Sequence, residues 1–300
     1  MNLQRYLSVS AEADAALRAG RPVVALDSTS AAHDMPPGQG LALARAKEEA
    51  VRAAGAVPAT VAVLDGVLHI GLQDDELRRV CSGTLSGKAS RREVPVLLAT
   101  GASAAATASA AMLAAVLVGI PVFAAAGIGG VRGGMDISAD LQELSRSSLA
   151  VVCGGPKPGC DDAATLEYLE TKGVPVLGLG SGQLPRFWCG PGPLDTDVAV
   201  DDEAQAARIA RIKWDTGLAG GVLLACGLPR GQALDAALAA GALADARALA
   251  DARGVRGHSL TPFLMAHILA GRPEAQAAYT ALSCRCAAAA SRLAAALCGR

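Results

Sequence analysis

Residues 94–131, VPVLLATGASAAATASAAMLAAVLVGIPVFAAAGIGGV, contain no charged residue and no histidine. Pro95, Gly101, Gly119 and Pro121 divide this stretch into pieces that are too short, or too small in side chain, to span a bilayer. The pieces VPVLLAT and IPVFAAAG are typical of buried strands, and the Ala-rich piece between them is typical of a helix. The stretch therefore predicts a buried strand, helix and strand.

The same alternation recurs on both sides of this stretch. Apolar, β-rich runs (PVVALDS, VPATVAVLDG, LAVVC and VPVLGLG) alternate with helical patterns near residues 38–54 and in DDAATLEYLE. After about residue 200 the pattern is helical, ending in a C-terminal helix from about residue 274. Such alternation predicts an α/β fold with a mostly parallel sheet covered on both faces. No Pro-, Ser- or charge-rich linker divides the chain, so residues 1–300 are expected to form a single domain.

Composition points to a small-molecule partner. The net charge of −1 comes with mixed signs along the chain, so we expect no nucleic acid and no anionic membrane surface as partners. The eight cysteines form no CxxC pair and are typical of reduced thiols in a cytoplasmic protein. The N-terminal residues lack the apolar core of a secretory signal, which also favours a cytoplasmic location.

Three loops after predicted strands carry candidate site residues. Ligands of α/β sheets bind outside the carboxyl ends of the strands, where Asp27, the glycine run 127–134 and Lys157 should converge. The run GIGGVRGG is no dinucleotide fingerprint, because Arg132 stands where the third glycine would be. Its backbone N–H groups and adjacent cation suit a single phosphate, although a bare glycine-rich turn fits the sequence as well.

The segment MDISADLQEL predicts a helix that begins at Ser138. Ser138 suits a helix N-cap, and Asp140 in the first turn complements the helix dipole. The alternative is functional: the helix N-terminus binds phosphate, while Asp136 and Asp140 face the same crevice for metal or proton chemistry.

Lys157 stands in a Gly/Pro loop, VVCGGPKPGCDD, of a chain that has 22 arginines and only five lysines. Most lysines are solvated surface residues, and this one could be too. A lysine at a strand end can instead attack a carbonyl and form a Schiff base, which arginine cannot do.

Ordered motifs along almost the whole chain resemble those of the pseudouridine-5′-phosphate glycosidase family, also called indigoidine synthase A-like. They include VVALDSTSAAHDMP, KASRREVP, VFAAAGIGGV, DISADLQEL and VVCGGPK. The resemblance implies a three-layer α/β/α fold around a mixed, mostly parallel sheet, a homotrimer, and a divalent metal, usually Mn²⁺. It also implies that a lysine Schiff base cleaves or forms the C–C bond between ribose 5-phosphate and uracil.

The resemblance assigns roles to the residues that match the family's motifs. Lys157 matches the imine-forming lysine, and Lys88 matches the lysine of phosphate binding and ring opening. Asp140 matches the catalytic aspartate, and Asp136 the metal ligand. The phosphate cradle is matched by Ser138 and the glycine run, with Gly127, Gly129 and Gly130.

The acceptor side departs from the family's pattern. Asp27 replaces a glutamate that handles the proton at the base carbon. A histidine of the glycine run is absent, which leaves Arg132 as a cation near the phosphate, and a threonine is replaced by Ala125. Arg285 and Cys286 stand where an asparagine pair reads uracil.

These departures favour a C-glycosynthase that joins C1 of ribose 5-phosphate to an electron-rich aromatic acceptor, as a branch of the family does with a polyketide in antibiotic biosynthesis. The alternatives are a pseudouridine-5′-phosphate glycosidase and a non-catalytic sugar-phosphate sensor. A kinase with a P-loop is excluded, because the chain contains no GxxxxGK[ST] motif.

Overall fold

The apolar runs of the sequence form the middle strands of a large sheet in the computed structural model, which describes residues 5–85 and 87–299. Within these residues the sheet has eleven strands. Its main path, from edge to edge, is β1 (Leu7–Val9), β4 (Val67–Ile70), β3 (Val57–Leu64), β2 (Val23–Leu26), β7 (Val122–Ala124), β8 (Ala150–Cys153), β13 (Val222–Ala225), β9 (Val176–Leu179) and β12 (Val198–Val200). Beside β3 lies β6 (Ala104–Ala106), which pairs with β5 (Lys88–Ala89).

The strand directions confirm a mixed, mostly parallel sheet. Every neighbouring pair from β3 through β2, β7, β8, β13 and β9 to β12 is parallel. Strand β3 pairs antiparallel with β4 and with β6. A separate hairpin of β10 (Gln183–Pro185) and β11 (Pro191–Asp195) lies outside this sheet.

Helices cover both faces, because alternate strand residues point to opposite sides. Val24 and Leu26 pack in one cluster with residues of α2 (Gly40–Ala53), α8 (Glu203–Asp215), α10 (Leu260–Gly271) and α11 (Pro273–Cys298). Val23 and Ala25 pack on the other face with α1 (Ala11–Arg18), α5 (Ala108–Val118), α6 (Ala139–Leu144) and α7 (Asp162–Thr171). This arrangement is the expected three-layer α/β/α fold.

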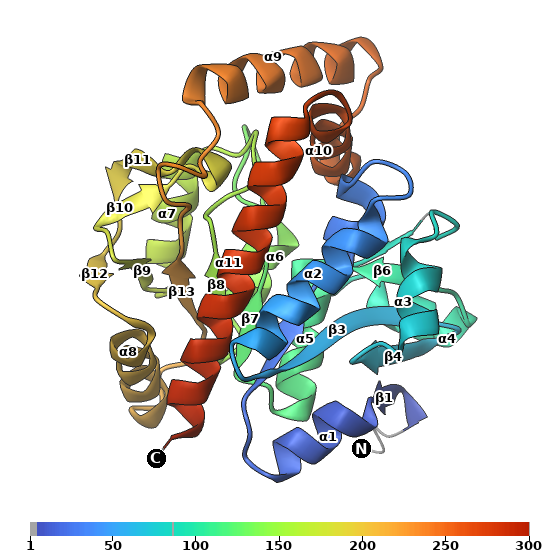
Figure 1. Cartoon of the computed structure of the whole chain (residues 1–300), viewed down its shortest axis with the longest axis vertical. Helices are drawn as coiled ribbons and strands as arrows, with labels where there is room; N and C mark the ends of the chain where they lie inside the picture. The colour runs from blue at the N-terminus through green and yellow to red at the C-terminus, as the bar shows by residue number, and fades with distance from the viewer. Residues whose placement is uncertain (1–4, 86, 300) are drawn as a thin grey trace.

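Helix α11 is the central helix of its layer and runs across the sheet between α2 and α8 (Figure 1). Its length and apolar composition would permit a membrane span, but half of its most apolar window is buried inside the protein. It packs on β2, β7 and β8, the three strands whose ends carry the predicted site. Helix α9 (Ala236–Ala252) packs on α10, and α3 (Asp74–Cys81) on α2.

Two predictions about individual elements were wrong. VPVLLAT, the expected strand, is helix α4 (Val94–Thr100), with Pro95 in its first turn and Gly101 closing it at φ 73°. Proline fits a helix start and left-handed glycine a helix end, and these signals outweigh the β-rich composition. The helical region after residue 200 also contains a strand, β13, in the middle of the sheet. The predicted helix and second strand of the quoted stretch are confirmed as α5 and β7.

Candidate active site

The carboxyl ends of β2, β7 and β8 open into one cavity of about 670 Å³. These strands are adjacent and parallel, so the loops that follow them meet at the same sheet edge. The cavity is lined by nearly all of the sequence-predicted site residues: Asp27, Lys88, Gly127, Gly129, Arg132, Asp136, Ser138, Asp140 and Lys157. Gly130 is not among the lining residues, and a Cβ there would meet Thr165 and Cys160.

Lys157 lies in the loop after β8 with its ammonium group directed at a buried carboxylate. Its Nζ is 2.7 Å from Oδ2 of Asp34, and the same oxygen accepts a hydrogen bond of 2.8 Å from the hydroxyl of Tyr279. Burial alone would lower the pKa of Lys157, but the carboxylates of Asp34 and Asp27 outweigh it and raise the pKa. Lys157 is therefore a positively charged ammonium at neutral pH.

Asp27 forms a second buried pair, with Lys47 from α2. Nζ of Lys47 is 2.8 Å from Oδ1 of Asp27, and it also donates to the Asp27 carbonyl and to Oγ of Ser30. The other carboxylate oxygen accepts from the Ser30 N–H at 2.8 Å and from the Thr29 hydroxyl at 3.2 Å. Burial acts to raise the pKa of Asp27, but Lys47 and Lys157 outweigh it and lower the pKa to about 2. Asp27 is therefore a fixed carboxylate.

Asp140 is held in place by the backbone around it. Its Oδ1 accepts from the Ser109 N–H at 2.9 Å, and its Oδ2 from the Gly129 N–H at 2.8 Å. Ser138 caps helix α6, as expected, and its Oγ accepts from the Asp140 N–H at 3.2 Å. A Cβ at position 129 would lie 2.2 Å from that Oγ, so only glycine permits this approach.

Part of the backbone of the glycine run is already hydrogen-bonded, so the run presents fewer free N–H groups than the sequence predicts. Gly129 donates to Asp140, Ile128 to the Gly155 carbonyl, and Val131 to the Thr165 hydroxyl. Its glycines permit close packing instead: a Cβ at Gly127 would lie 2.5 Å from the Phe187 ring. Anion binding in this cavity therefore depends on side chains more than on the glycine backbone.

Two further cations face the cavity. Nζ of Lys88 donates to the His258 carbonyl at 2.5 Å; burial, and then repulsion from Lys157, lower the pKa of Lys88. The Arg132 guanidinium donates to the Thr261 hydroxyl, and one of its terminal nitrogens is 3.7 Å from Asp136. Its buried Nε has no hydrogen-bond partner among the described residues. An unpaired buried donor is costly, because its lost hydration is not replaced by a hydrogen bond.

The predicted metal residue, Asp136, is 41% exposed and faces Arg132. Among residues 5–85 and 87–299, no group of three or more His, Cys, Asp or Glu side chains could hold a metal ion. These residues therefore do not form a complete set of protein ligands for a metal ion. Asp136 fits a hydrated ion of the Mg²⁺ type, which keeps most of its waters and uses one carboxylate together with a substrate phosphate.

Sequence reasoning missed three residues of the site: Asp34, Lys47 and Tyr279. Asp34 lies inside the motif VVALDSTSAAHDMP, where a second acidic residue close to a strand end was a usable signal. Lys47 is one of only five lysines, but the glutamates that follow it made it resemble a surface residue. Tyr279 comes from α11, far away in the sequence, and no local pattern marks it.

The expected acceptor residues Arg285 and Cys286 lie outside the cavity lining. Arg285 is exposed and donates to the Gly227 carbonyl at 2.7 Å, whereas Cys286 is buried against the Cys226 carbonyl. The segment before and at the start of α10 lines the cavity beside Lys88 and Arg132, with Gly257, His258, Ser259, Thr261 and Pro262.

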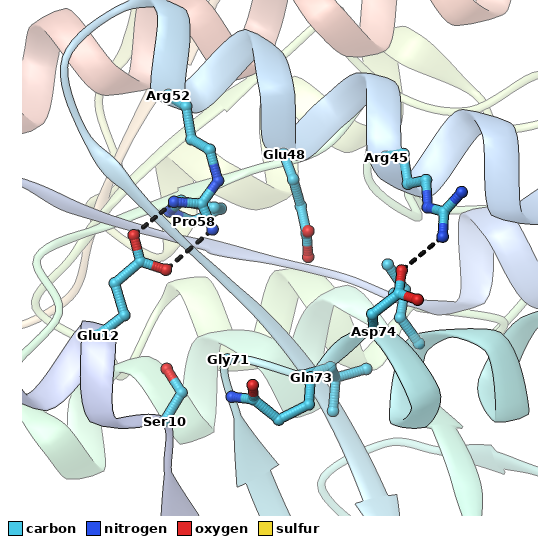
Figure 2. A pocket seen from close by; sticks show the side chains of 11 residues that line it. Ser10, Glu12, Arg45, Glu48, Arg52, Pro58, Gly71, Gln73 and Asp74 are labelled. Carbon is cyan, nitrogen blue, oxygen red and sulfur yellow. Dashed lines mark hydrogen bonds and ion pairs between the residues drawn. The ribbon is translucent and has the colours of Figure 1, made fainter.

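A smaller cavity of about 200 Å³ lies on the other side of α2 (Figure 2). Arg52 pairs with Glu12 and Arg45 with Asp74, as the dashed lines show, and Glu48 points between these pairs. Burial raises the pKa of Glu48, whose carboxyl accepts from the Thr60 hydroxyl at 2.5 Å. Both arginines are already paired with carboxylates, so neither is available to bind an anion.

Relatives match this chain over most of its length. A pseudouridine-5′-phosphate glycosidase of Caldanaerobacter subterraneus is 48% identical over 270 residues, which cover 89% of this chain and 88% of that protein. The prealnumycin C-glycosynthase AlnA, solved in complex with ribulose 5-phosphate, is 36% identical with a TM-score of 0.87, covering 98% of this chain and 97% of that one.

An indigoidine synthase A-like protein from Thermotoga maritima, solved by crystallography, is 25% identical with a TM-score of 0.85, again covering 98% of this chain and 97% of that one. The family model described as "Indigoidine synthase A like protein" matches residues 12–296. The match spans all the strand-end loops that form the larger cavity, and the chain belongs to the indigoidine synthase A-like family.

Proposed function

We propose that this protein forms or cleaves a C–C glycosidic bond at C1 of ribose 5-phosphate through a Schiff base on Lys157. The observation that carries the proposal is the placement of Lys157 in a cavity that also presents Lys88 and Arg132. A C–C bond has no leaving oxygen for an acid to protonate, so the sugar itself must accept the electron pair, and an iminium at C1 can do so. The sugar-phosphate complex of AlnA supports a ligand of this class.

The residues divide between the two ends of the sugar. Lys88, Arg132 and Ser138 bind the phosphate, with Gly127, Gly129 and Gly130 shaping the loop that lets it approach. Lys157 attacks C1, and Asp140, fixed by two backbone N–H groups, exchanges protons with the sugar hydroxyls during ring opening. Asp27 faces the same cavity as a permanent carboxylate and stabilises positive charge where the new bond forms.

The favoured reaction is C-ribosylation of an electron-rich aromatic acceptor. Its ring carbon attacks the iminium, and loss of the ring proton restores aromaticity. The cavity of about 670 Å³ is within the range of sites that bury drug-sized ligands, and it has room for a sugar phosphate and a flat ring. The glutamate-to-aspartate change at Asp27 also sets the acceptor side apart from the family's pattern.

Cleavage or synthesis of pseudouridine 5′-phosphate is the second candidate. It is favoured by the 48% identity to a protein of that name. In addition, Arg285 and Cys286 do not line the cavity, so their identity gives no argument against uracil. The two candidates share the Lys157 iminium and differ only in the acceptor.

Three further properties belong to the same proposal. Mn²⁺ would bind through Asp136 with its waters and, when bound, supplies positive charge beside the substrate phosphate. The protein is proposed to be a homotrimer of single domains that span residues 1–300. All eight cysteines are free thiols, which supports a cytoplasmic location.

Reductive trapping tests the Schiff base directly. Borohydride added with ribose 5-phosphate should attach one sugar phosphate to Lys157, detected by mass spectrometry of the intact chain and its peptides. Lys157→Ala should abolish the label, because it removes the amine that attacks C1. Lys172 is exposed, so Lys172→Ala should keep the label. Full labelling and turnover of Lys157→Ala would exclude the mechanism.

Removing a proposed phosphate contact should lower the affinity for ribose 5-phosphate and leave the protein folded. Lys88→Ala and Ser138→Ala should each weaken binding of ribose 5-phosphate by about one to two decades, since a charge-assisted contact contributes roughly 1.5–3 kcal/mol. Isothermal titration calorimetry measures the change, with the exposed Arg146→Ala as the control. Unchanged affinity in both variants would place the phosphate elsewhere.

The buried Asp27–Lys47 pair predicts a stability effect with a defined pH dependence. Lys47→Met leaves a buried carboxylate without its cation and should cost about 3–5 kcal/mol of unfolding free energy. With a folded pKa of about 2, Asp27 stabilises the fold above its unfolded value and loses that contribution as the pH falls through the folded value.

Urea unfolding between pH 2 and 7 checks this prediction, with Asp27→Asn combined with Lys47→Met as the paired control. The double variant should recover most of the lost stability and lose less stability towards low pH. Wild-type stability in Lys47→Met would show that the pair contributes little.

A competition of acceptors separates the two candidate reactions. We expect ribose 5-phosphate and an electron-rich phenol to give a C-ribosylated product, with cleavage of pseudouridine 5′-phosphate weak in comparison. Both rates are measured by liquid chromatography on the same Mn²⁺-supplemented protein. Efficient cleavage of pseudouridine 5′-phosphate without any phenol product would establish the second candidate instead.

A further inference from the structure

Asp34 is the carboxylate closest to the proposed nucleophile, and no motif match assigned it a role. It ends a single π-helical turn, Ser30–Asp34, which begins shortly after the end of β2 at Leu26. Its side chain is 3% exposed, and that of Lys157 is 14% exposed. Both residues line the cavity, so their contact is at the wall of the site and not behind it.

Lys157 requires a proton acceptor before it can react. An ammonium has no free electron pair, and the neighbouring carboxylates hold Lys157 in that form, as its raised pKa indicates. Besides Asp34, the carboxylates whose charge acts on Lys157 are those of Asp27 and Asp140, and both are already occupied. Asp27 is saturated by Lys47, Ser30 and Thr29, and both oxygens of Asp140 accept backbone N–H groups.

We propose that Asp34 is the general base and acid of the imine step: it accepts the proton of Lys157 and later gives it to the departing water. This inference rests on the proposed function, because it assigns a role within the Lys157 Schiff-base reaction. The distance of 2.7 Å between Nζ and Oδ2 is within the reach required for direct proton transfer.

The step balances without any other reactant. Asp34 takes one proton from the Lys157 ammonium, and the amine adds to the C1 aldehyde of the open-chain sugar. A proton moves from nitrogen to oxygen to give the neutral carbinolamine. Its C–O bond then breaks while the protonated Asp34 returns its proton to the leaving hydroxyl, so water departs and an iminium remains. Asp34 is again a carboxylate, and its negative charge stabilises the iminium beside it.

Tyr279 positions this carboxylate. Its hydroxyl donates to the same Oδ2 that faces Lys157, at 2.8 Å, and its ring is fully buried. Trp188 and Phe187 pack around the ring, with centroids 6.2 and 5.9 Å away. Tyr279 belongs to helix α11, whereas Lys157 follows β8, so two separate elements hold the Asp34 carboxylate in place.

The test measures the rate of imine formation, by timed borohydride trapping of wild-type protein with ribose 5-phosphate. Asp34→Asn keeps the size of the side chain but cannot take a proton. We expect trapping to slow by about 100-fold or more, as for loss of a general base, with sugar affinity within about threefold of wild type. The exposed Asp215→Asn serves as the matched control and should trap at the wild-type rate.

The trapping rate of Asp34→Ala is also measured with and without sodium formate. A purely structural role of Asp34 predicts no difference between these two rates. Formate can occupy the space of the lost carboxylate, and we expect it to accelerate trapping by at least about tenfold. This ratio is taken within one sample, so a partly unfolded preparation does not change it.

The outcomes separate the two proposals. A wild-type protein that is never labelled overturns the Schiff-base function and this inference with it. Labelling of wild type together with an Asp34→Asn rate within about tenfold of it, or no effect of formate, overturns the role of Asp34 alone. If neither Asp34→Asn nor Asp34→Ala folds, Asp34 is required for folding, and its role as general base is likewise overturned.

Discussion

The ion pair between Lys157 and Asp34, together with a hydrogen bond from Tyr279, joins three distant parts of the chain in the wall of the cavity. The lysine follows β8, the aspartate follows β2, and Tyr279 of α11 donates to the same carboxylate. Desolvating a charge costs several kcal/mol, and this cost is offset only when the partners and hydrogen bonds are all in place. The parallel order β2, β7, β8 and the central helix α11 bring these partners together. The order of the strands therefore also makes it possible to keep a charged nucleophile in a mostly buried position.

A second buried pair, Asp27 with Lys47, lies in the same wall and has a different character. All donors of Lys47 are used, and both oxygens of Asp27 are bound. Asp34, in contrast, shares one oxygen between a reactive amine and a tyrosine hydroxyl. One pair is therefore a fixed structural charge, whereas the other can exchange a proton with the group that reacts. Three of the five lysines of the chain, Lys47, Lys88 and Lys157, lie at this cavity or in its wall.

Sequence reasoning succeeded where local signals and topology agree. The apolar runs gave strands, and the rule that strand-end loops converge brought Asp27, the glycine run and Lys157 into one cavity. It failed at VPVLLAT, where Pro95 and Gly101 bound a helix despite a β-rich composition, and at β13, a short strand within a helical region. Asp34, Lys47 and Tyr279 could not be assigned because their roles depend on contacts between residues far apart in the sequence. Arg285 and Cys286 do not line the cavity, because motif order locates α11 but only its packing decides which of its faces reaches the site.

The central claim is that Lys157 bonds covalently to C1 of ribose 5-phosphate while its phosphate lies against Lys88, Arg132 and Ser138. A crystal structure of the protein soaked with ribose 5-phosphate tests both halves at once. We expect continuous electron density from Nζ of Lys157 to C1 of an open-chain sugar, with the phosphate beside Lys88 and Arg132. A sugar phosphate bound with C1 remote from Lys157, or with its phosphate away from Lys88 and Arg132, would contradict it.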